Sequence, residues 1–219
     1  LEAGGKDRNI WIHVPVGFQK LLNHPHLNWN FKTEPEDNVR GRSIPIPRGK
    51  VIGGSSSING MLYVRGQAFD YDVWGQLGNR GWSYSDILPY FQKSESFERG
   101  GDDYRGGSGP LNVDDMYERH ELIDAFIDAG VEIGSKRNPD YNGAEQEGFG
   151  YYQITQRNGR RESTARAFLN PAKSRPNLTV ISRAHATKIL TEGKRAVGVA
   201  FEVDGLPREE RANAEVIVS

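Results

Sequence analysis

Cysteine is absent from this chain of 219 residues. The sequence can therefore form no disulfide framework, no thiolate metal site and no cysteine nucleophile, which fits a reducing compartment without proving one. Long apolar runs are also absent, because none approaches the roughly 20 residues that span a bilayer. The formal net charge is −1 and the basic residues are dispersed, so nothing indicates binding to nucleic acid or to an anionic membrane.

Glycine, in contrast, is abundant, with 26 residues, and the mean hydropathy is −0.66. Together these values predict a loop-rich chain. Its length allows one or two domains with a sizeable core.

The most informative stretch is rich in glycine and serine and runs from Arg48 to Met61. The pair Gly53-Gly54 lets the backbone approach a ligand closely, and the serines that follow add hydroxyl donors. Free N–H groups at a helix start point toward anionic oxygens, and Arg48 and Lys50 add positive potential. The residues indicate a phosphate or pyrophosphate site, but a serine-rich helix cap on a turn explains them equally well.

A longer pattern around this stretch has many fixed positions. It reads Gly49-Lys50-x-Ile52-Gly53-Gly54-Ser55-Ser56-x-Ile58-Asn59, followed in register by Tyr63, Gly66 and Asp72. This pattern resembles the first signature of the glucose–methanol–choline (GMC) oxidoreductases, which are FAD-dependent enzymes that oxidise alcohols. Further similar segments follow in the same order along essentially the whole chain, among them Gly81-Trp82-Ser83-Tyr84, Ser163-Thr164-Ala165-Arg166 and Ala214-Glu215-Val216-Ile217. The segment Tyr63-Val64-Arg65-Gly66 is similar to the choline-dehydrogenase-like branch.

The resemblance implies contacts with FAD along the chain. Glu2, with Ala3 beside it, would hold the adenosine ribose, as an acidic residue at a strand end commonly does. Ala186 would contact the adenine through its backbone. The residues implied around the pyrophosphate and the flavin ring are Val51, Gly53, Gly54, Ser55, Asn59, Gly60, Met61 and Leu62. Some relatives attach the flavin to a histidine beside the asparagine; this chain has Ile58 there, so we predict non-covalent FAD.

The resemblance also implies a fold class. We expect α/β (α+β) structure, with a partial Rossmann-like FAD-binding domain and part of a substrate-binding domain. The expected divisions are the end of the first FAD-binding segment (1–24), a lid or loop (25–47), an extended FAD-binding segment (48–105), part of the substrate-binding domain (106–175) and a return to the FAD-binding domain (176–219).

Two features of a complete family member are missing. No G-x-G-x-x-G turn occurs, and none of the five histidines resembles the catalytic one, so we assign no catalytic residue. We expect an internal segment of a longer enzyme, one that does not fold alone because its sheet would lack a strand. The pair His24 and His26 suggests a metal, but the proline between them and the absence of nearby acidic residues or cysteines argue against one.

The resemblance implies that a primary alcohol, choline-like, aliphatic or aryl, is oxidised to an aldehyde. Hydride would pass to the flavin, and oxygen or a quinone would accept the electrons. The small-molecule alcohol and this acceptor are the expected partners. Two alternatives remain at this point: a catalytically inactive module that binds flavin or a partner, and an unrelated phosphate-binding domain.

Local patterns predict several elements. We expect a short helix over 58–65, a helix opened by a capping box over Ser83-Tyr84-Ser85-Asp86, and an amphipathic helix over 120–130 whose apolar face is core and whose end is capped by Gly130. Hairpin strands are expected over 186–190 and 197–203, with turns at Glu192-Gly193-Lys194 and Asp204-Gly205, and a buried strand over 215–219. Residues 98–109 are polar and predict an exposed loop. An aromatic residue between 141 and 152 is expected to line the alcohol pocket.

Overall fold

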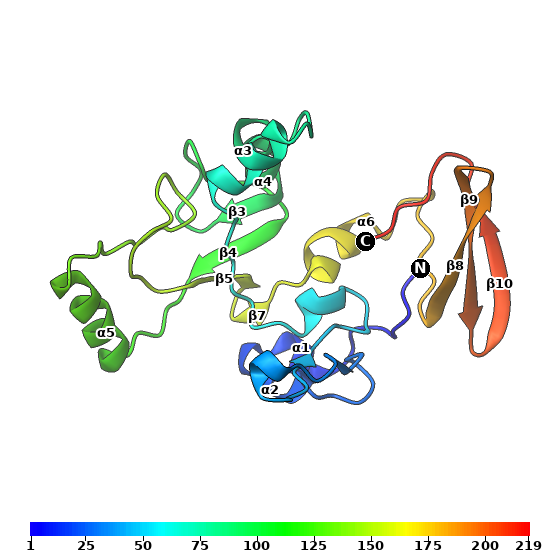
Figure 1. Ribbon diagram of the computed structural model, residues 1–219, viewed down its shortest axis with the longest axis horizontal. Coiled ribbons are helices and arrows are strands. Elements are labelled where there is room, and N and C mark those ends of the chain that lie inside the picture. Colours follow the sequence, from blue (N-terminus) through cyan, green and yellow to red (C-terminus); the bar gives the residue numbers. More distant parts are fainter. The chain divides into compact units, whose positions relative to one another are not determined.

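The computed structural model describes residues 1–219 and divides into two compact units. The first unit comprises Leu1–Asn59 and Thr164–Ser219, and the second comprises Gly60–Ser163. Both units contain helices and strands, so the predicted α/β class is confirmed (Figure 1). None of the helices is long and apolar enough to cross a membrane.

The first unit contains short helical elements, a two-stranded sheet and a three-stranded sheet. Its helical elements are α1 (Ile10–His13), η1 (Pro15–Gly17), α2 (Phe18–Leu21), η2 (Asp37–Val39), η3 (Gly54–Ser57), η4 (Ala165–Leu169) and α6 (Asn170–Ala172). Its strands are β1 (Phe31–Lys32), β2 (Pro45–Ile46), β8 (Ala184–Glu192), β9 (Arg195–Val203) and β10 (Leu206–Arg211).

The three last strands form an antiparallel meander in the order β10-β9-β8, which Figure 1 shows as a twisted sheet. Its turns lie at Gly193 and at Asp204-Gly205, and all three residues have positive φ, a conformation that favours glycine, asparagine and aspartate. The predicted strands 186–190 and 197–203 lie within β8 and β9, so the hairpin is confirmed.

A small apolar core joins the start of the first unit to the glycine- and serine-rich stretch. Ile12, Leu21, Val51 and Ile58 are at most 2% exposed and form one cluster, with Leu27 packed against it. Two of the four come from the ends of the motif, so burial of these side chains anchors the turn that lies between them.

The second unit combines three helices with a three-stranded sheet. Its helices are α3 (Ala68–Gln76), α4 (Tyr84–Ser94) and α5 (Glu121–Glu132). Its strands are β3 (Glu95–Phe97), β4 (Leu111–Asp115), β5 (Gln153–Ile154), β6 (Gln156–Arg157) and β7 (Arg160–Arg161). The sheet order is β3-β4-β5, with β3 parallel and β5 antiparallel to β4.

The helix opened by Ser83 is confirmed. α4 begins with a capping box in which the Ser83 side chain accepts from the third helical residue and Asp86 accepts from the Ser83 N–H. This reciprocal pair satisfies two of the donors that a helix start leaves without partners.

The predicted helix over 58–65 is wrong. The helical turn is the 3₁₀ helix η3, which ends at Ser57, and residues 61–65 are not helical. The Met61 carbonyl accepts from Thr155 N (2.9 Å), and Tyr63 N donates to the Gln153 carbonyl (2.9 Å). Because these backbone groups pair with the chain around β5, they are not available for a helix.

The predicted amphipathic helix exists as α5, but two details are wrong. Gly130 lies inside the helix, and a Cβ there would be 2.7 Å from the Phe149 ring, so an aromatic contact explains the glycine. Gly134, with φ +97°, follows the end of the helix instead. Within the unit only Ile127 of the predicted apolar face is buried, whereas Phe126 remains 64% exposed.

Two further predictions are wrong, one of a strand and one of an exposed loop. Residues 215–219 form no strand, and Ile217 is 79% exposed. The polar loop 98–109 is not wholly exposed, because Arg105 is 1% exposed and pairs with the buried carboxylate of Glu95. Composition indicated a solvated loop, but ion pairing with distant residues removed one charge from water.

Candidate cofactor site

The glycine turn, residues 49–57, is shaped by consecutive left-handed residues. Gly53 has φ +90° and Gly54 has φ +54°, which non-glycine residues rarely adopt. A Cβ on Gly49 would lie 2.2 Å from the Gly54 carbonyl oxygen, so this position also requires glycine. A Cβ on Gly54 would meet nothing within 4 Å. The turn therefore exposes its backbone on the open side of Gly54.

The serines after the glycine pair fasten this turn. The Ser56 hydroxyl donates to the Gly53 carbonyl (2.5 Å), and the buried Ser57 hydroxyl donates to the Ile52 carbonyl (2.9 Å). Ser55 is exposed, and its oxygen accepts from Gly49 N (3.1 Å), which leaves its proton for another acceptor. The turn includes only four helical residues, those of η3, so it can bind an anion through local donors and not through a long helix dipole.

Glu2 lies in an extended segment beside this turn. Its backbone is bridged in parallel to Ser182, and Gly5 is bridged in parallel to Val51, so residues 2–5 lie between the signature and the chain leading to β8. A Cβ on Gly4 would lie 1.9 Å from the Lys50 carbonyl oxygen. The backbone of this segment therefore packs directly on the glycine turn.

The Glu2 carboxylate accepts from Gly4 N (2.6 Å) through one oxygen. Burial raises the pKa of Glu2 above its ordinary value of 4.5, although the Gly4 N–H opposes the shift. A half-buried carboxylate that is not fully compensated within the chain suits an external hydroxyl donor, such as a ribose. Ala3 follows it and is also half-buried.

Ala186 lies on β8, paired with Phe201 and next to a bulge. It is exposed and lines a hollow of about 580 Å³ in the first unit, together with Leu1, Val199 and Val216. A small side chain at this place keeps the strand backbone accessible.

The remaining predicted contacts divide between the units. Asn59 is exposed and ends the first unit, with its N–H donating to the Ser55 carbonyl (2.9 Å). Gly60, Met61 and Leu62 begin the second unit, where Met61 is buried with φ +64° and Leu62 is 49% exposed.

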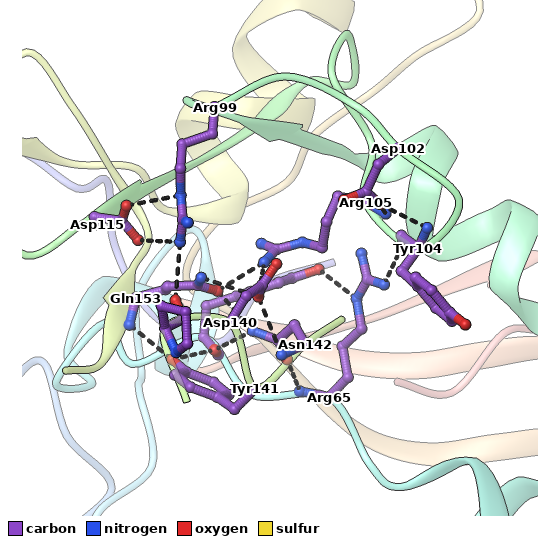
Figure 2. Close-up of polar contacts among 12 residues, drawn as sticks. Arg65, Arg99, Asp102, Tyr104, Arg105, Asp115, Asp140, Tyr141, Asn142 and Gln153 are labelled. Atoms are coloured by element: carbon purple, nitrogen blue, oxygen red, sulfur yellow. Dashed lines mark hydrogen bonds and ion pairs between the residues drawn. The ribbon is translucent and has the colours of Figure 1, made fainter. Parts of the chain in front are cut away.

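The second unit contains a buried group of polar side chains, which we call the polar network (Figure 2). It consists of Arg65, Glu95, Arg105, Asp140, Asn142 and Gln153. Glu95 is fully buried between two arginines: Arg65 Nη2 lies 2.6 Å from Oε2, and Arg105 Nη2 lies 2.6 Å from Oε1. Gly106 N also donates to Oε2 (2.9 Å).

The charges of the network compensate one another. Arg105 donates to Asp140 Oδ1 (2.5 Å) as well as to Glu95. Burial alone would lower the pKa of Arg105, but hydrogen bonds and charges of Glu95 and Asp140 outweigh it and raise that pKa. Burial raises the pKa of Tyr141 to about 12, so its hydroxyl stays protonated and can donate. The two arginines and two carboxylates of the network therefore balance in charge.

Aromatic residues gather around an apolar hollow of about 480 Å³ in the second unit. Tyr141, Phe149, Tyr151 and Tyr152 all line it, together with Phe126 of α5. The structure thus brings together the aromatic residues from which we predicted an alcohol pocket. Phe149 also packs against Phe126, with ring centroids 5.5 Å apart.

The polar network is what sequence reasoning missed. Its members come from separate places between residues 65 and 153, with no periodic spacing. The only available signal was the charged pair Asp102 and Arg105 inside a loop, where Asp102 Oδ1 accepts from Arg105 N (2.7 Å). His24, one of the two histidines that suggested a metal, bonds to nearby backbone: its Nδ1 accepts from His26 N and from Leu27 N, each at 3.2 Å.

Comparison with known proteins identifies what this arrangement is similar to. The sequence model of the family described as GMC oxidoreductase matches residues 32–219. "Oxygen-dependent choline dehydrogenase" from Photobacterium profundum is 48% identical over all of this chain, which spans 39% of that relative's length.

Solved structures give the same picture of the fold. The crystal structure of pyridoxine 4-oxidase from Mesorbium loti matches 97% of the chain with a TM-score of 0.92 and 31% identity, over 42% of its own length. An FAD-dependent oxidoreductase from Chaetomium thermophilum matches 97% of the chain with a TM-score of 0.87 and 29% identity, over 39% of its length.

Proposed function

The chain belongs to the GMC oxidoreductase family, and we propose that the protein containing it is an FAD-dependent alcohol oxidoreductase. The observation that carries this proposal is the glycine turn, whose open left-handed backbone at Gly54 adjoins the Glu2 segment within one unit. A dinucleotide needs both features, close backbone donors for its pyrophosphate and an acidic acceptor for its ribose.

The residues have separate roles in holding the cofactor. Gly54 and Ser55 offer the backbone approach and a hydroxyl donor for the pyrophosphate, and Val51 supports them from the core. Glu2, with Ala3 beside it, binds the ribose.

Ala186 contributes strand backbone to the adenine. Asn59, Gly60, Met61 and Leu62 contact the flavin ring. FAD, when bound, accepts a hydride from the alcohol carbon.

The cofactor is held without a covalent bond, because the position beside Asn59 is Ile58, which has no nucleophilic atom. The substrate is a small primary alcohol of choline-like type. The name of the Photobacterium relative supports this choice, and the aromatic hollow suits a quaternary ammonium group through cation–π attraction. Oxygen or a quinone takes up the electrons.

The test uses protein purified from the whole reading frame that contains this chain. We expect a flavin absorbance spectrum that bleaches anaerobically when choline is added, and flavin that is released into solution when the protein is denatured with acid. If no flavin binds after incubation with FAD, the proposal is wrong. If bound flavin bleaches with another alcohol and not with choline, the substrate type is wrong and the cofactor assignment stands.

A matched pair of variants tests the pyrophosphate role. Gly54→Asp and Gly54→Asn place similar side chains in the open space beside the turn, and both residues tolerate left-handed backbone. Only aspartate brings a negative charge close to the phosphates, so we expect Gly54→Asp to bind FAD at least about tenfold more weakly than Gly54→Asn. Equal affinities would place the phosphates elsewhere.

A further inference from the structure

Two sets of groups bond the backbone of residues 61–65: the chain around β5 and the side chains of residues 141–146. Toward β5, the Met61 carbonyl accepts from Thr155 N and Tyr63 N donates to the Gln153 carbonyl. Between these two bonds, Leu62 and Ile154 form an isolated antiparallel bridge.

Beyond this bridge no regular ladder forms, and side chains bond the segment instead; one of them is Tyr141, whose Oη accepts from Gln153 N (2.7 Å). Asn142 Nδ2 donates to the Tyr63 carbonyl (3.0 Å), and Asn142 Oδ1 accepts from Arg65 N (2.8 Å). A carboxamide carries a donor and an acceptor in one plane, so Asn142 binds the segment as a peptide group of a neighbouring strand would. Tyr141 Oη also donates to the Tyr63 carbonyl (2.9 Å), and Gln146 Nε2 donates to the Arg65 carbonyl (2.6 Å).

The polar network fixes the orientation of this carboxamide. Asn142 is 3% exposed, and its Nδ2 also donates to Gln153 Oε1 (2.9 Å). That oxygen accepts in turn from Arg105 Nη1 (2.9 Å), while Asp140 Oδ1 accepts from Asn142 N (3.2 Å). Figure 2 shows Asn142 among Arg105, Asp140 and Gln153, with its own bond to the backbone of Arg65. With Gln153 accepting, the nitrogen of the carboxamide must face Tyr63 and its oxygen must face Arg65.

The held segment includes an unusual backbone conformation. Met61 has φ +64°, which places a non-glycine residue in the left-handed region. Such conformations persist only where the surroundings impose them, and they gather at functional sites. The proposed flavin contacts Gly60, Met61 and Leu62 lie at this end of the segment.

We propose that Asn142 is a positioning residue that fixes the backbone of residues 61–65 and thereby the flavin contacts at 60–62. This inference rests on the proposed function, because the flavin contacts belong to it. Asn142 acts through the backbone of Tyr63 and Arg65, and the charged pairs of Arg105 with Glu95 and Asp140 keep its carboxamide in one orientation.

The test compares Asn142→Ala with Asn138→Ala in the full-length flavin-bound protein. Asn138 is in the same loop, but its side chain bonds only within that loop, to Asp140 N and to the Glu145 and Glu147 carbonyls. Both variants loosen the loop, and only Asn142→Ala removes bonds to the segment. Gln146→Ala is a milder second variant, because it removes only the bond to the Arg65 carbonyl.

Two measurements separate positioning from general stability. In Asn142→Ala we expect hydrogen exchange at the Arg65 amide to become about tenfold faster, because its acceptor is lost. We also expect the visible circular dichroism of the bound flavin to change and its reduction by alcohol to slow about tenfold, with KM little altered. Asn138→Ala should leave the flavin spectrum and the exchange at the Arg65 amide unchanged. Gln146→Ala should change the flavin spectrum and the reduction rate in the same direction as Asn142→Ala, by less.

The outcomes are distinct. A wild-type protein that binds no flavin contradicts the proposed function and this inference with it. A wild type that binds and reduces flavin, with Asn142→Ala and Asn138→Ala giving the same spectrum and rate, contradicts this inference alone. If Asn142→Ala does not fold, an unchanged flavin spectrum and reduction rate in Gln146→Ala contradict it instead.

Discussion

The glycine turn and the polar network each hold a short piece of backbone in a fixed shape, but they do so in opposite ways. In the turn, consecutive residues provide the shape, through positive φ at Gly53 and Gly54 and through serine hydroxyls that bond carbonyls a few residues away. In the network, side chains from distant parts of the chain meet around Glu95 and support residues 61–65.

The difference also sets how each region responds to damage. The turn uses neutral hydrogen bonds, which contribute about 1 kcal/mol each to stability, and two glycines, Gly49 and Gly53, where a Cβ would collide with neighbouring atoms. The network uses buried charges, so removing one partner leaves another charge in a low dielectric at a cost of about 3–5 kcal/mol. The turn is therefore sensitive to added atoms and the network to removed ones.

The largest expected effect comes from breaking the network at Arg105. Arg105→Met leaves Asp140 without its charged partner and Glu95 with one arginine instead of two, so we expect the free energy of unfolding to fall by about 3–5 kcal/mol. Arg99→Met is the matched control, because Arg99 and Arg105 both lie over the Phe97 ring. The ion pair of Arg99 with Asp115 is partly exposed, so we expect its loss to cost less than about 1 kcal/mol. Thermal unfolding of both full-length variants provides the measurement, and equal losses would mean that burial of the network does not matter.

Adding one carbon beside the turn should have the next largest effect. Gly4→Ala brings a Cβ to 1.9 Å from the Lys50 carbonyl oxygen, so the two segments must separate, and we expect a loss of about 2–3 kcal/mol together with weaker FAD binding. At Gly5 a Cβ would meet nothing within 4 Å, and Gly5→Ala should leave stability and FAD affinity nearly unchanged. Thermal unfolding and a flavin titration test both variants. A harmless Gly4→Ala would show that the contact between the two segments is not needed.

Gly130 sharpens the comparison, because it is a glycine that distant packing requires. Alanine would improve helix propensity by about 1 kcal/mol, but its Cβ would lie 2.7 Å from the Phe149 ring. We expect Gly130→Ala to destabilise the protein by about 1–2 kcal/mol net, measured by thermal unfolding. The double variant Gly130→Ala with Phe149→Leu should recover part of this loss, and a stabilising Gly130→Ala alone would mean that the ring moves away freely.

The smallest expected effect is a dependence on pH at Glu2. Because burial raises its pKa above 4.5, the folded protein binds this proton more tightly than the unfolded chain does. Stability therefore falls as pH rises through the interval between 4.5 and the raised pKa, and it stays lower at neutral pH.

Glu2→Gln removes this cost. Without cofactor we expect the variant to melt slightly higher than the parent at neutral pH and at the same temperature well below pH 4.5, while it binds FAD more weakly. A variant that melts lower at neutral pH would show that the carboxylate stabilises the first unit.

The sequence predicted well the elements whose causes are local. Ser83 and Asp86 form the predicted cap of α4, and the residues at Gly193 and Asp204-Gly205 form the predicted turns of the meander. The turn at the glycine pair and its serines was predictable for the same reason, since its conformation depends on the sterics of these residues and on hydrogen bonds within a few residues. The α/β class and the GMC family were also predicted correctly.

The tertiary structure alone decided the features that depend on distant partners. Gly60 is the one local signal against a helix over 58–65, and the helix is absent because the chain around β5 takes the backbone hydrogen bonds of Met61 and Tyr63. Arg105 is buried, against the polarity of its loop, because Glu95 and Asp140 compensate its charge.

Gly130 likewise is explained by Phe149 and not by a cap. The sequence by itself thus determined the local turns and caps, where neighbouring residues fix the backbone angles. The burial of Arg105 and the hydrogen bonding of residues 61–65 were decided by the tertiary structure, because their free energy depends on residues that only the fold brings together.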